Sequence, residues 1–332
     1  MKTHRRTLLV VMAVCGLSSS PLSGQEPSPP KRDTSHILAM MENWFTEGQV
    51  PEVAKVDRDT VYGMVSGLAL LMDVYYPQTP NGYGIVQISG SGFTRQLRYD
   101  ARQLKHSPHV PNEARPLLAA GYAVFALNHR AAPRFQYPDQ VADVQRAVRF
   151  IRHEADRYGI DREKIGAIGG SSGGHLVSML GVLNGDENRM DEDPINQESG
   201  KVQCVIAVEA PSDFIEWDGA EHFLGVRYKE RTQPNTIENR LALEASPTTH
   251  VSPDDAPILL VHGDADTDVP FRLSELFFKR LTDASVSSRF IRVPGGQHAF
   301  QFFDKRPKDL DDIYVKWFNQ HLRGIASENS QD

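Results

Sequence analysis

Cysteine is scarce in this sequence. The 332 residues include only Cys15 and Cys204. Cys15 lies in a segment that we expect to be removed, so one thiol remains and no disulfide can form within the mature chain. Cys204 stands in the apolar run 202–208, where a small apolar thiol is typical of a buried structural cysteine. Catalysis by a cysteine nucleophile therefore has no support.

An excess of positive charge is also missing. The chain has 36 Lys and Arg against 43 Asp and Glu, which gives a formal net charge of −7. A basic surface for nucleic acid is therefore not expected. Apolar residues make up 40% of the sequence, an ordinary proportion for a globular protein, and the length suits one large α/β domain.

Long hydrophobic runs are absent as well. The apolar run 8–17 is too short to span a bilayer. Lys2, Arg5 and Arg6 precede it and small residues follow, which is the order of a secretory signal peptide. We expect residues 1–24 to be removed on secretion or export to the periplasm, by the general or the twin-arginine route. No stable membrane anchor is expected.

The remaining chain divides by composition into three parts. Pro, Ser and charged residues at the start of 25–50 indicate an N-terminal arm or linker. Residues 51–325 read as one catalytic domain, and 326–332 as a C-terminal tail.

Short apolar runs alternate with amphipathic helical patterns through this domain. The strand-like runs are 55–62, 68–75, 84–88, 123–127, 164–168, 202–208, 257–261 and 288–293. Helical patterns follow at 139–158, 273–281 and 313–318. This alternation predicts an α/β fold, a mostly parallel sheet with helices on both faces. Functional residues are then expected just after the strands.

Several charged clusters read as solvated surface. Basic residues follow residue 92 on an expected helix and also mark one face of the helix 139–158. They are Arg95, Arg98, Arg102, Lys105, Arg146, Arg149 and Arg152. The acidic segment 186–193 lacks the spacing of an EF-hand, so a calcium site is not expected there.

A glycine-rich turn follows the strand run 164–168. Residues 169–176 read G-G-S-S-G-G-H-L, and G-x-S-x-G between a strand and a helix indicates a nucleophile elbow. Two frames fit, with either Ser171 or Ser172 as the nucleophile. The shorter connection to the strand favours Ser171.

A serine nucleophile needs a base and an acid that orients the base. The acid-rich turn after run 257–261 offers Asp264, Asp266 and Asp268, and composition alone does not choose among them. His298 follows the last strand run. The chain order of serine, acid and histidine is that of an α/β-hydrolase.

These motifs resemble those of a known group of enzymes. Segment 169–176 is similar to G-D-S-A-G-G-H-L of esterases related to hormone-sensitive lipase and to bacterial feruloyl and acetyl-xylan esterases. Segment 128–133 resembles D-Y-R-L-A-P, and 158–161 resembles Y-G-I-D. The resemblance covers roughly residues 56–321. It implies an α/β-hydrolase fold with eight strands, the second of them antiparallel.

The resemblance also implies roles for single residues. It makes Ser171 the nucleophile, Asp266 the triad acid and His298 the base. The loop 87–93 resembles H-G-G-G-F, with serine at positions 89 and 91 in place of histidine and glycine.

That loop implies an oxyanion hole built from the backbone N–H groups of Gly90, Ser91 and Ser172. The Ser91 hydroxyl either adds a third donor or only fits the turn, and the residues leave both open. Segments 93–110 and 213–246 are expected to wall the pocket.

Together these features predict a carboxylic-ester hydrolase that forms an acyl-enzyme. The expected substrates are small-molecule or polysaccharide-linked esters, of short-chain, acetyl or feruloyl type. A serine peptidase of the prolyl-oligopeptidase type and a non-catalytic binding protein are the alternatives. No HExxH, CxxC or P-loop motif is present, so no metal or other cofactor is expected. Rates are expected to rise through a histidine pKa of about 6 to 7.

Overall fold

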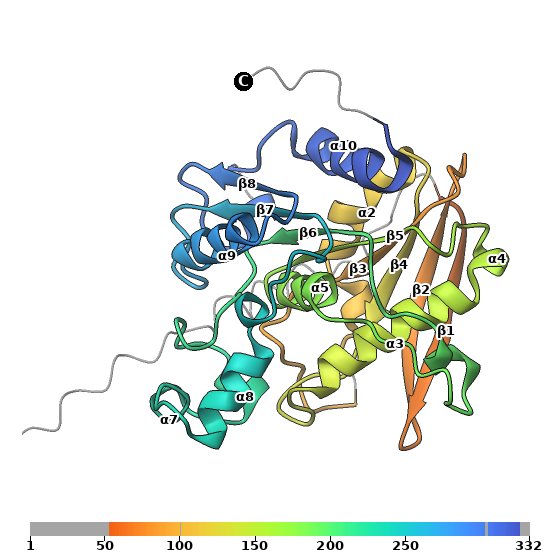
Figure 1. The fold of residues 1–332 in the computed structure, drawn as a ribbon. Coiled ribbons are helices and arrows are strands. Elements are labelled where there is room, and N and C mark those ends of the chain that lie inside the picture. Colours follow the sequence, from red (N-terminus) through yellow and green to blue (C-terminus); the bar gives the residue numbers. More distant parts are fainter. Residues whose placement is uncertain (1–52, 100, 303–304, 326–332) are drawn as a thin grey trace, which may run out of the picture. The chain divides into compact units, whose positions relative to one another are not determined.

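The computed structural model describes residues 53–99, 101–302 and 305–325 (Figure 1). The predicted signal peptide 1–24, the arm 25–50 and the tail 326–332 lie outside these residues. None of the helices in the described ranges is long and apolar enough to cross a membrane. The domain bounds 51–325 stay a prediction.

One eight-stranded sheet forms the centre of the described chain. Its strands are β1 (Val53–Val65), β2 (Leu68–Pro77), β3 (Gly84–Ile88), β4 (Ala123–Asn128), β5 (Ile165–Gly170), β6 (Cys204–Val208), β7 (Ile258–Gly263) and β8 (Ser288–Val293). Their order across the sheet is β1-β2-β4-β3-β5-β6-β7-β8. β2 pairs antiparallel with β1 and β4, and the remaining pairs are parallel. The expected mostly parallel sheet with an antiparallel second strand is confirmed.

Helices cover both faces of the sheet. The main ones are α2 (His109–Ala119), α3 (Asp139–His153), α4 (Ala155–Tyr158), α5 (Ser172–Val182), α9 (Arg272–Asp283) and α10 (Leu310–Arg323). α2 and α10 contact each other and share one buried apolar cluster. α3, α5 and α9 contribute to the cluster on the opposite face (Figure 1). β3 to β6 are buried on both faces, which explains their continuous apolar sequences.

The helix expected over 139–158 is divided in two. α3 ends at His153, and α4 begins after Glu154 and ends before Gly159, which has a left-handed φ of 66°. The apolar side chains on both sides of the break, such as Ile151 and Ala155, stay buried. The amphipathic pattern therefore continues although the helix does not.

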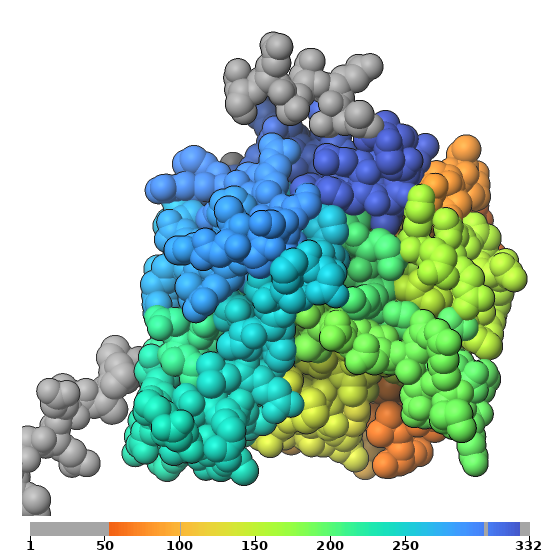
Figure 2. Space-filling view, in the orientation of Figure 1, coloured from red at the N-terminus to blue at the C-terminus, as the bar shows by residue number. Residues whose placement is uncertain are grey.

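A small separate core lies beneath α6 (Glu221–Leu224), α7 (Tyr228–Arg231) and α8 (Ile237–Ala245). Phe223 stacks on Phe93 with ring centroids 4.1 Å apart. His175 of α5 contacts the same rings and lies 2.8 Å from the carbonyl oxygen of Ala245. Figure 2 shows the teal residues of this segment as a corner of the visible surface. The segment is therefore anchored to the helix that follows the glycine-rich turn.

Candidate active site

The glycine-rich turn joins β5 directly to α5. The strand continues to Gly170, two residues beyond the predicted run, and Ser171 alone separates it from the helix. Ser171 has φ 52° and ψ −124°, a conformation that L-residues rarely adopt. Its N–H donates to the carbonyl oxygen of Val208 at 2.8 Å. This sharp junction raises the Ser171 side chain above the carboxyl end of the sheet.

Two glycines make the junction possible. A Cβ on Gly169 would lie 2.7 Å from the carbonyl oxygens of Ile88 and Gly173. A Cβ on Gly173 would overlap the same oxygen of Ile88. The backbone of the turn therefore packs directly on the end of β3, with no room for side chains.

The structure brings Ser171, His298 and Asp266 together. His298 Nδ1 lies 2.7 Å from Asp266 Oδ2, and His298 Nε2 lies 3.0 Å from Ser171 Oγ. An ionised carboxylate only accepts hydrogen bonds, so Nδ1 carries the proton and Nε2 accepts from the serine hydroxyl. Asp266 follows β7 and His298 follows β8, at the same edge of the sheet. Of the other two acids in the turn, Asp264 accepts hydrogen bonds from Arg292 and Gly295, and Asp268 donates its N–H to Asp266.

The Asp266 carboxylate is held by four donors. The N–H groups of Asp268 and Val269 donate to Oδ1 at 2.9 Å, and His298 donates to Oδ2. His262 Nε2 lies 3.1 Å from Oδ2 and 2.9 Å from the carbonyl oxygen of Val269, so this nitrogen carries a proton. Burial alone raises the pKa of Asp266, but the hydrogen bonds from His262 and His298 outweigh it. The pKa therefore lies well below the ordinary carboxyl value.

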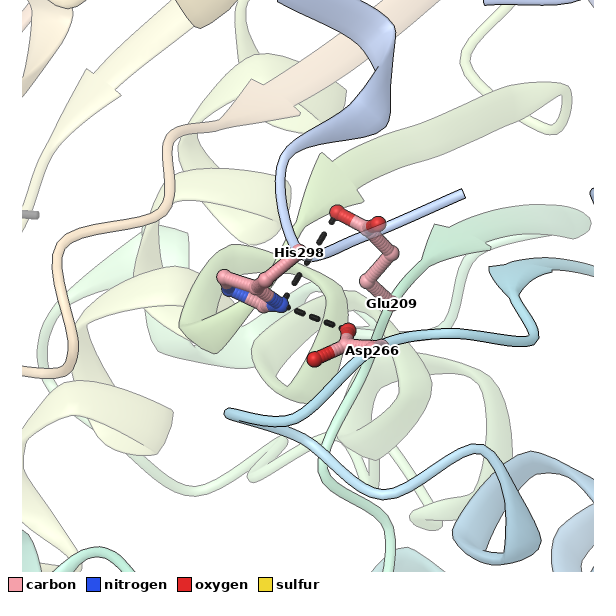
Figure 3. A group of neighbouring side chains, drawn as sticks. All are labelled: Glu209, Asp266 and His298. Carbon is pink, nitrogen blue, oxygen red and sulfur yellow. Dashed lines mark hydrogen bonds and ion pairs between the residues drawn. The ribbon is translucent and has the colours of Figure 1, made fainter. Parts of the chain in front are cut away.

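A buried carboxyl group that sequence reasoning missed lies beside this pair. Glu209 follows β6, is 1% exposed, and its Oε2 lies 4.0 Å from His298 Nδ1 (Figure 3). Burial raises its pKa to about 8. A single acid directly after an apolar strand, at the edge that carries the triad, is the one signal that could have found it.

The carboxyl groups also act on the histidine. Burial lowers the pKa of His298, but the charges of Glu209 and Asp266 and the hydrogen bond to Asp266 outweigh burial and raise it to about 9. The expectation of about 6 to 7 took no account of Glu209 and corresponds to an almost unperturbed imidazole.

Glu209, Asp266 and His298 form the one group of potential metal ligands in the described ranges, with ligand atoms within 4.8 Å of one another. His298 Nδ1 carries a proton and donates it in a hydrogen bond to Asp266 Oδ2. A cation bound there would have to displace that proton. The arrangement suits an acid–base pair better than a metal centre.

The loop after β3 lies against the nucleophile. A Cβ on Gly90 would stand 2.9 Å from the Cβ of Ser171. The N–H of Ser91 donates to Ser172 Oγ at 2.9 Å, and Ser91 Oγ is buried and makes no hydrogen bond with another described residue. The motif assigns Ser172 a role through its N–H alone, so the contact of its hydroxyl with Ser91 is an addition. Whether Gly90, Ser91 and Ser172 form an oxyanion hole stays a prediction.

The expectation that the basic clusters face water is wrong in two places. Residues 95–99 and 101–103 form no helix, and Lys105 is buried, with Nζ 2.5 Å from Asp73 and 2.8 Å from Asp59. Arg152 is 3% exposed and donates to the carbonyl oxygens of Ser199 and Lys201. Both cations are therefore structural.

The acidic segment 186–193 meets the same face of α3. Arg146 forms an ion pair with Asp193 at 2.7 Å, and Arg149 donates to the carbonyl oxygen of Asp186. Asp191 accepts the N–H of Asp193. The arginines of α3 thus hold the loop that covers them. Contacts between this loop and α3 account for the basic residues of the helix and for the acidic residues of segment 186–193.

The likeness of this chain to known proteins agrees with the geometry of the site. A family model described as BD-FAE matches residues 72–281, well over half of the sequence. The chain belongs to the BD-FAE family. Its predicted resemblance to α/β-hydrolase esterases is confirmed. The curated relatives of this BD-FAE chain include a probable carboxylic ester hydrolase, LipM, of Mycobacterium tuberculosis (strain ATCC 25618 / H37Rv).

The similarity to LipM is 32% identity over 196 residues, 57% of this chain and 45% of LipM. The chain thus spans about half the length of the curated relatives it matches. Among solved structures, a truncated carbohydrate esterase from gut microbiota is 28% identical with a TM-score of 0.65, and covers 81% of this chain and 98% of its own. An acetyl ester-xyloside bifunctional hydrolase from Caldicellulosiruptor lactoaceticus shares the fold, with a TM-score of 0.67 at 23% identity over 80% of this chain and 98% of its own.

Proposed function

We propose that this BD-FAE family chain hydrolyses carboxylic esters through an acyl-enzyme on Ser171. The observation that carries the proposal is the continuous hydrogen-bond chain from Ser171 Oγ through His298 to Asp266. A serine hydroxyl becomes a useful nucleophile when a neutral imidazole takes its proton and a carboxylate orients that imidazole. The similarity to LipM, whose name is that of a carboxylic ester hydrolase, supports the same reaction class.

The reaction has two halves. Ser171 Oγ attacks the ester carbonyl while His298 Nε2 takes its proton, and the imidazolium then gives that proton to the leaving alcohol. Water then attacks the acyl-enzyme while His298 takes its proton. This step releases the carboxylic acid of the substrate and restores Ser171. The N–H groups at the start of α5 and in the loop after β3 are the proposed donors to the negative oxygen of each tetrahedral intermediate.

Small acyl groups on carbohydrate alcohols are the proposed substrates. The similarity to a carbohydrate esterase from gut microbiota supports an ester of a sugar or polysaccharide. We propose that the acyl group is of acetyl or feruloyl type. Segments 93–110 and 213–246 are the proposed walls of the pocket, because Phe93 and the α6–α8 core adjoin the Ser91 loop.

Substitution of the nucleophile tests the proposal. We expect Ser171→Ala to lower kcat on p-nitrophenyl acetate by about 10⁴- to 10⁶-fold, because the covalent intermediate can no longer form. Rates measured on acetylated xylan, on feruloylated sugars and on esters of longer acids define the substrate range. A peptide p-nitroanilide series tests the peptidase alternative.

Labelling with a fluorophosphonate identifies the reactive residue directly. Peptide mapping should find the adduct on Ser171, and the Ser171→Ala variant should not react. An adduct on Ser172 would contradict the assignment of Ser171 as the nucleophile. The hydroxyl of Ser172 accepts a hydrogen bond from Ser91, whereas the hydroxyl of Ser171 lies beside His298. A chain that hydrolyses none of these esters and takes no label would indicate the non-catalytic alternative.

A further inference from the structure

Glu209 occupies an unusual place in the fold. It follows the fully buried strand β6 and is itself 1% exposed. Its backbone has φ 50°, in the left-handed region that glutamate seldom adopts. Conformations of this kind persist only where the surrounding structure imposes them, and they are frequent at functional sites. The backbone of Glu209 therefore holds an ionisable side chain in a buried site.

The carboxyl group of Glu209 reaches the loop that carries His298. Its Oε2 accepts the N–H of Ala299 at 2.7 Å and lies 4.0 Å from His298 Nδ1. Its Oε1 is buried and makes no hydrogen bond with another described residue. Figure 3 shows Glu209 and Asp266 approaching the same ring nitrogen from two sides. His298 thus has two carboxyl neighbours, of which only Asp266 is within hydrogen-bond distance.

The other titratable groups around this pair come from three elements. Asp268 acts on His298 from the loop after β7, and His262 at the end of β7 is bonded to Asp266. Tyr314 of α10 interacts electrostatically with Glu209, and burial raises the pKa of its phenol well above the ordinary value. The other charged groups that act on Tyr314 are Glu113, Arg306 and Asp311. The charged groups that act on the His298 imidazole are therefore mainly carboxyl groups.

We propose that Glu209 is a positioning residue that holds the His298 loop through Ala299 and supplies a second negative charge to the imidazole. The proposal rests on the proposed function. Asp266 accepts the hydrogen bond from Nδ1–H and orients the ring, while Glu209 stabilises the imidazolium that forms when His298 takes the proton of Ser171. Burial raises the pKa of Glu209 to about 8, whereas the charges of both carboxyl groups raise that of His298. The two groups therefore titrate together.

The sign of the effect follows from this arrangement. Hydrolysis needs neutral His298, so kcat/KM rises with pH as the imidazolium loses its proton. A negative charge at Glu209 favours the imidazolium and moves this rise to higher pH. Removal of that charge moves the rise to lower pH.

Substitution by glutamine isolates the charge. Glu209→Gln keeps an oxygen that can accept the N–H of Ala299 but carries no charge. We expect the rise of kcat/KM to move down by about one pH unit, as an opposite charge at this distance predicts. At the optimum, kcat should fall by about tenfold, the equivalent of one pKa unit. KM should change by less than about twofold, because buried Glu209 is not expected to touch substrate.

Two further variants separate charge from structure. Asp264 Oδ1 accepts the N–H of Gly295 at 2.7 Å, so it supports the same loop without a contact to His298. Asp264→Asn should leave the pH profile in place. Glu209→Asp retains the charge on a shorter side chain and should return the profile toward that of the wild type.

An unchanged or upward-shifted profile in a folded Glu209→Gln variant overturns the proposal. If thermal melting shows that this variant does not fold, titration of ¹⁵N-labelled His298 in Ser171→Ala provides the test. A titration of His298 in two steps, as expected when it titrates together with Glu209, supports the proposal, and a single step overturns it. Failure of the proposed function looks different, because the wild-type chain would then neither hydrolyse esters nor take the label on Ser171.

Discussion

The backbone and the side chain of Ser91 differ in their hydrogen bonding. Its N–H donates to Ser172 Oγ, whereas its own hydroxyl is buried without a hydrogen bond to another described residue. The loop that carries it lies against Ser171 through Gly90, and a short hydroxyl in that loop can donate to an oxyanion. We expect Ser91→Ala to lower kcat by about a hundredfold with little change in KM, because the bond forms mainly in the transition state. Steady-state kinetics on p-nitrophenyl acetate measures both constants.

Thermal unfolding supplies the second half of that prediction. Removal of an unpaired buried hydroxyl breaks no hydrogen bond, so the melting temperature of Ser91→Ala should not fall. Ser89 is the matched control, since its hydroxyl contacts the Gln87 side chain instead of the site. A Ser91→Ala variant with kcat within about threefold of the wild type would show that the hydroxyl only fits the turn.

Single residues of the site differ in how well the sequence predicts them. Ser171 and His298 stand in motifs that follow strands, so a parallel sheet predicts that they lie at the same edge, although the motif alone also fits Ser172. Asp266 needed the family resemblance, because three acids in one turn are equivalent by composition. Glu209 belongs to no motif, and its role depends on a left-handed backbone and on a loop 90 residues further along the chain. Such distant contacts leave no local pattern.

At the scale of elements, a buried ion pair ties the loop after β3 to the sheet. Lys105 Nζ contacts Asp73 of β2 and Asp59 of β1, and the Asp73 side chain is fully buried. Burial alone raises the pKa of Asp73, but hydrogen bonds from His106 and Lys105 outweigh it and lower the pKa from 3.8 to about 2. A lowered folded-state pKa means that this carboxylate stabilises the fold above pH 3.8 and loses that effect as pH falls toward 2.

We expect Asp73→Asn to lower the free energy of unfolding by about 2 kcal/mol at pH 7. The difference from the wild type should shrink as pH falls through this window. Urea unfolding at several pH values measures both. Asp283→Asn is the control, since Asp283 pairs with Lys279 on an exposed helix surface and should matter little. Equal effects of the two substitutions would contradict the prediction.

Elements are predicted well where periodicity decides them. All eight strand runs lie within one or two residues of strands in the structure or inside a longer strand. The surroundings of charged side chains are not predicted, because periodicity shows which helix face is apolar but not what covers the other face. Arg152 illustrates this, since the loop that accepts its hydrogen bonds lies more than 45 residues away in the sequence.

At the scale of the whole molecule, residues 51–325 are predicted to fold and act alone. They include every strand of the described sheet and the whole of α10. We expect a chain of these residues to match the full sequence in melting temperature and in kcat on p-nitrophenyl acetate. A chain beginning at residue 79 lacks β1 and β2, exposes the apolar cluster that Met72 and Val74 help to fill, and should not fold. Loss of activity in 51–325 would show that the domain extends further.

The close packing of Gly169 and Gly173 on the end of β3 limits how this protein can change during evolution. Any side chain at either position would collide with backbone atoms, so mutation there removes function before it can alter substrate choice. New specificity has to arise in surrounding segments that tolerate substitution. The α6–α8 region, with a small core of its own around Phe93 and Phe223, is the part of the chain where laboratory selection for new esters should accumulate its changes.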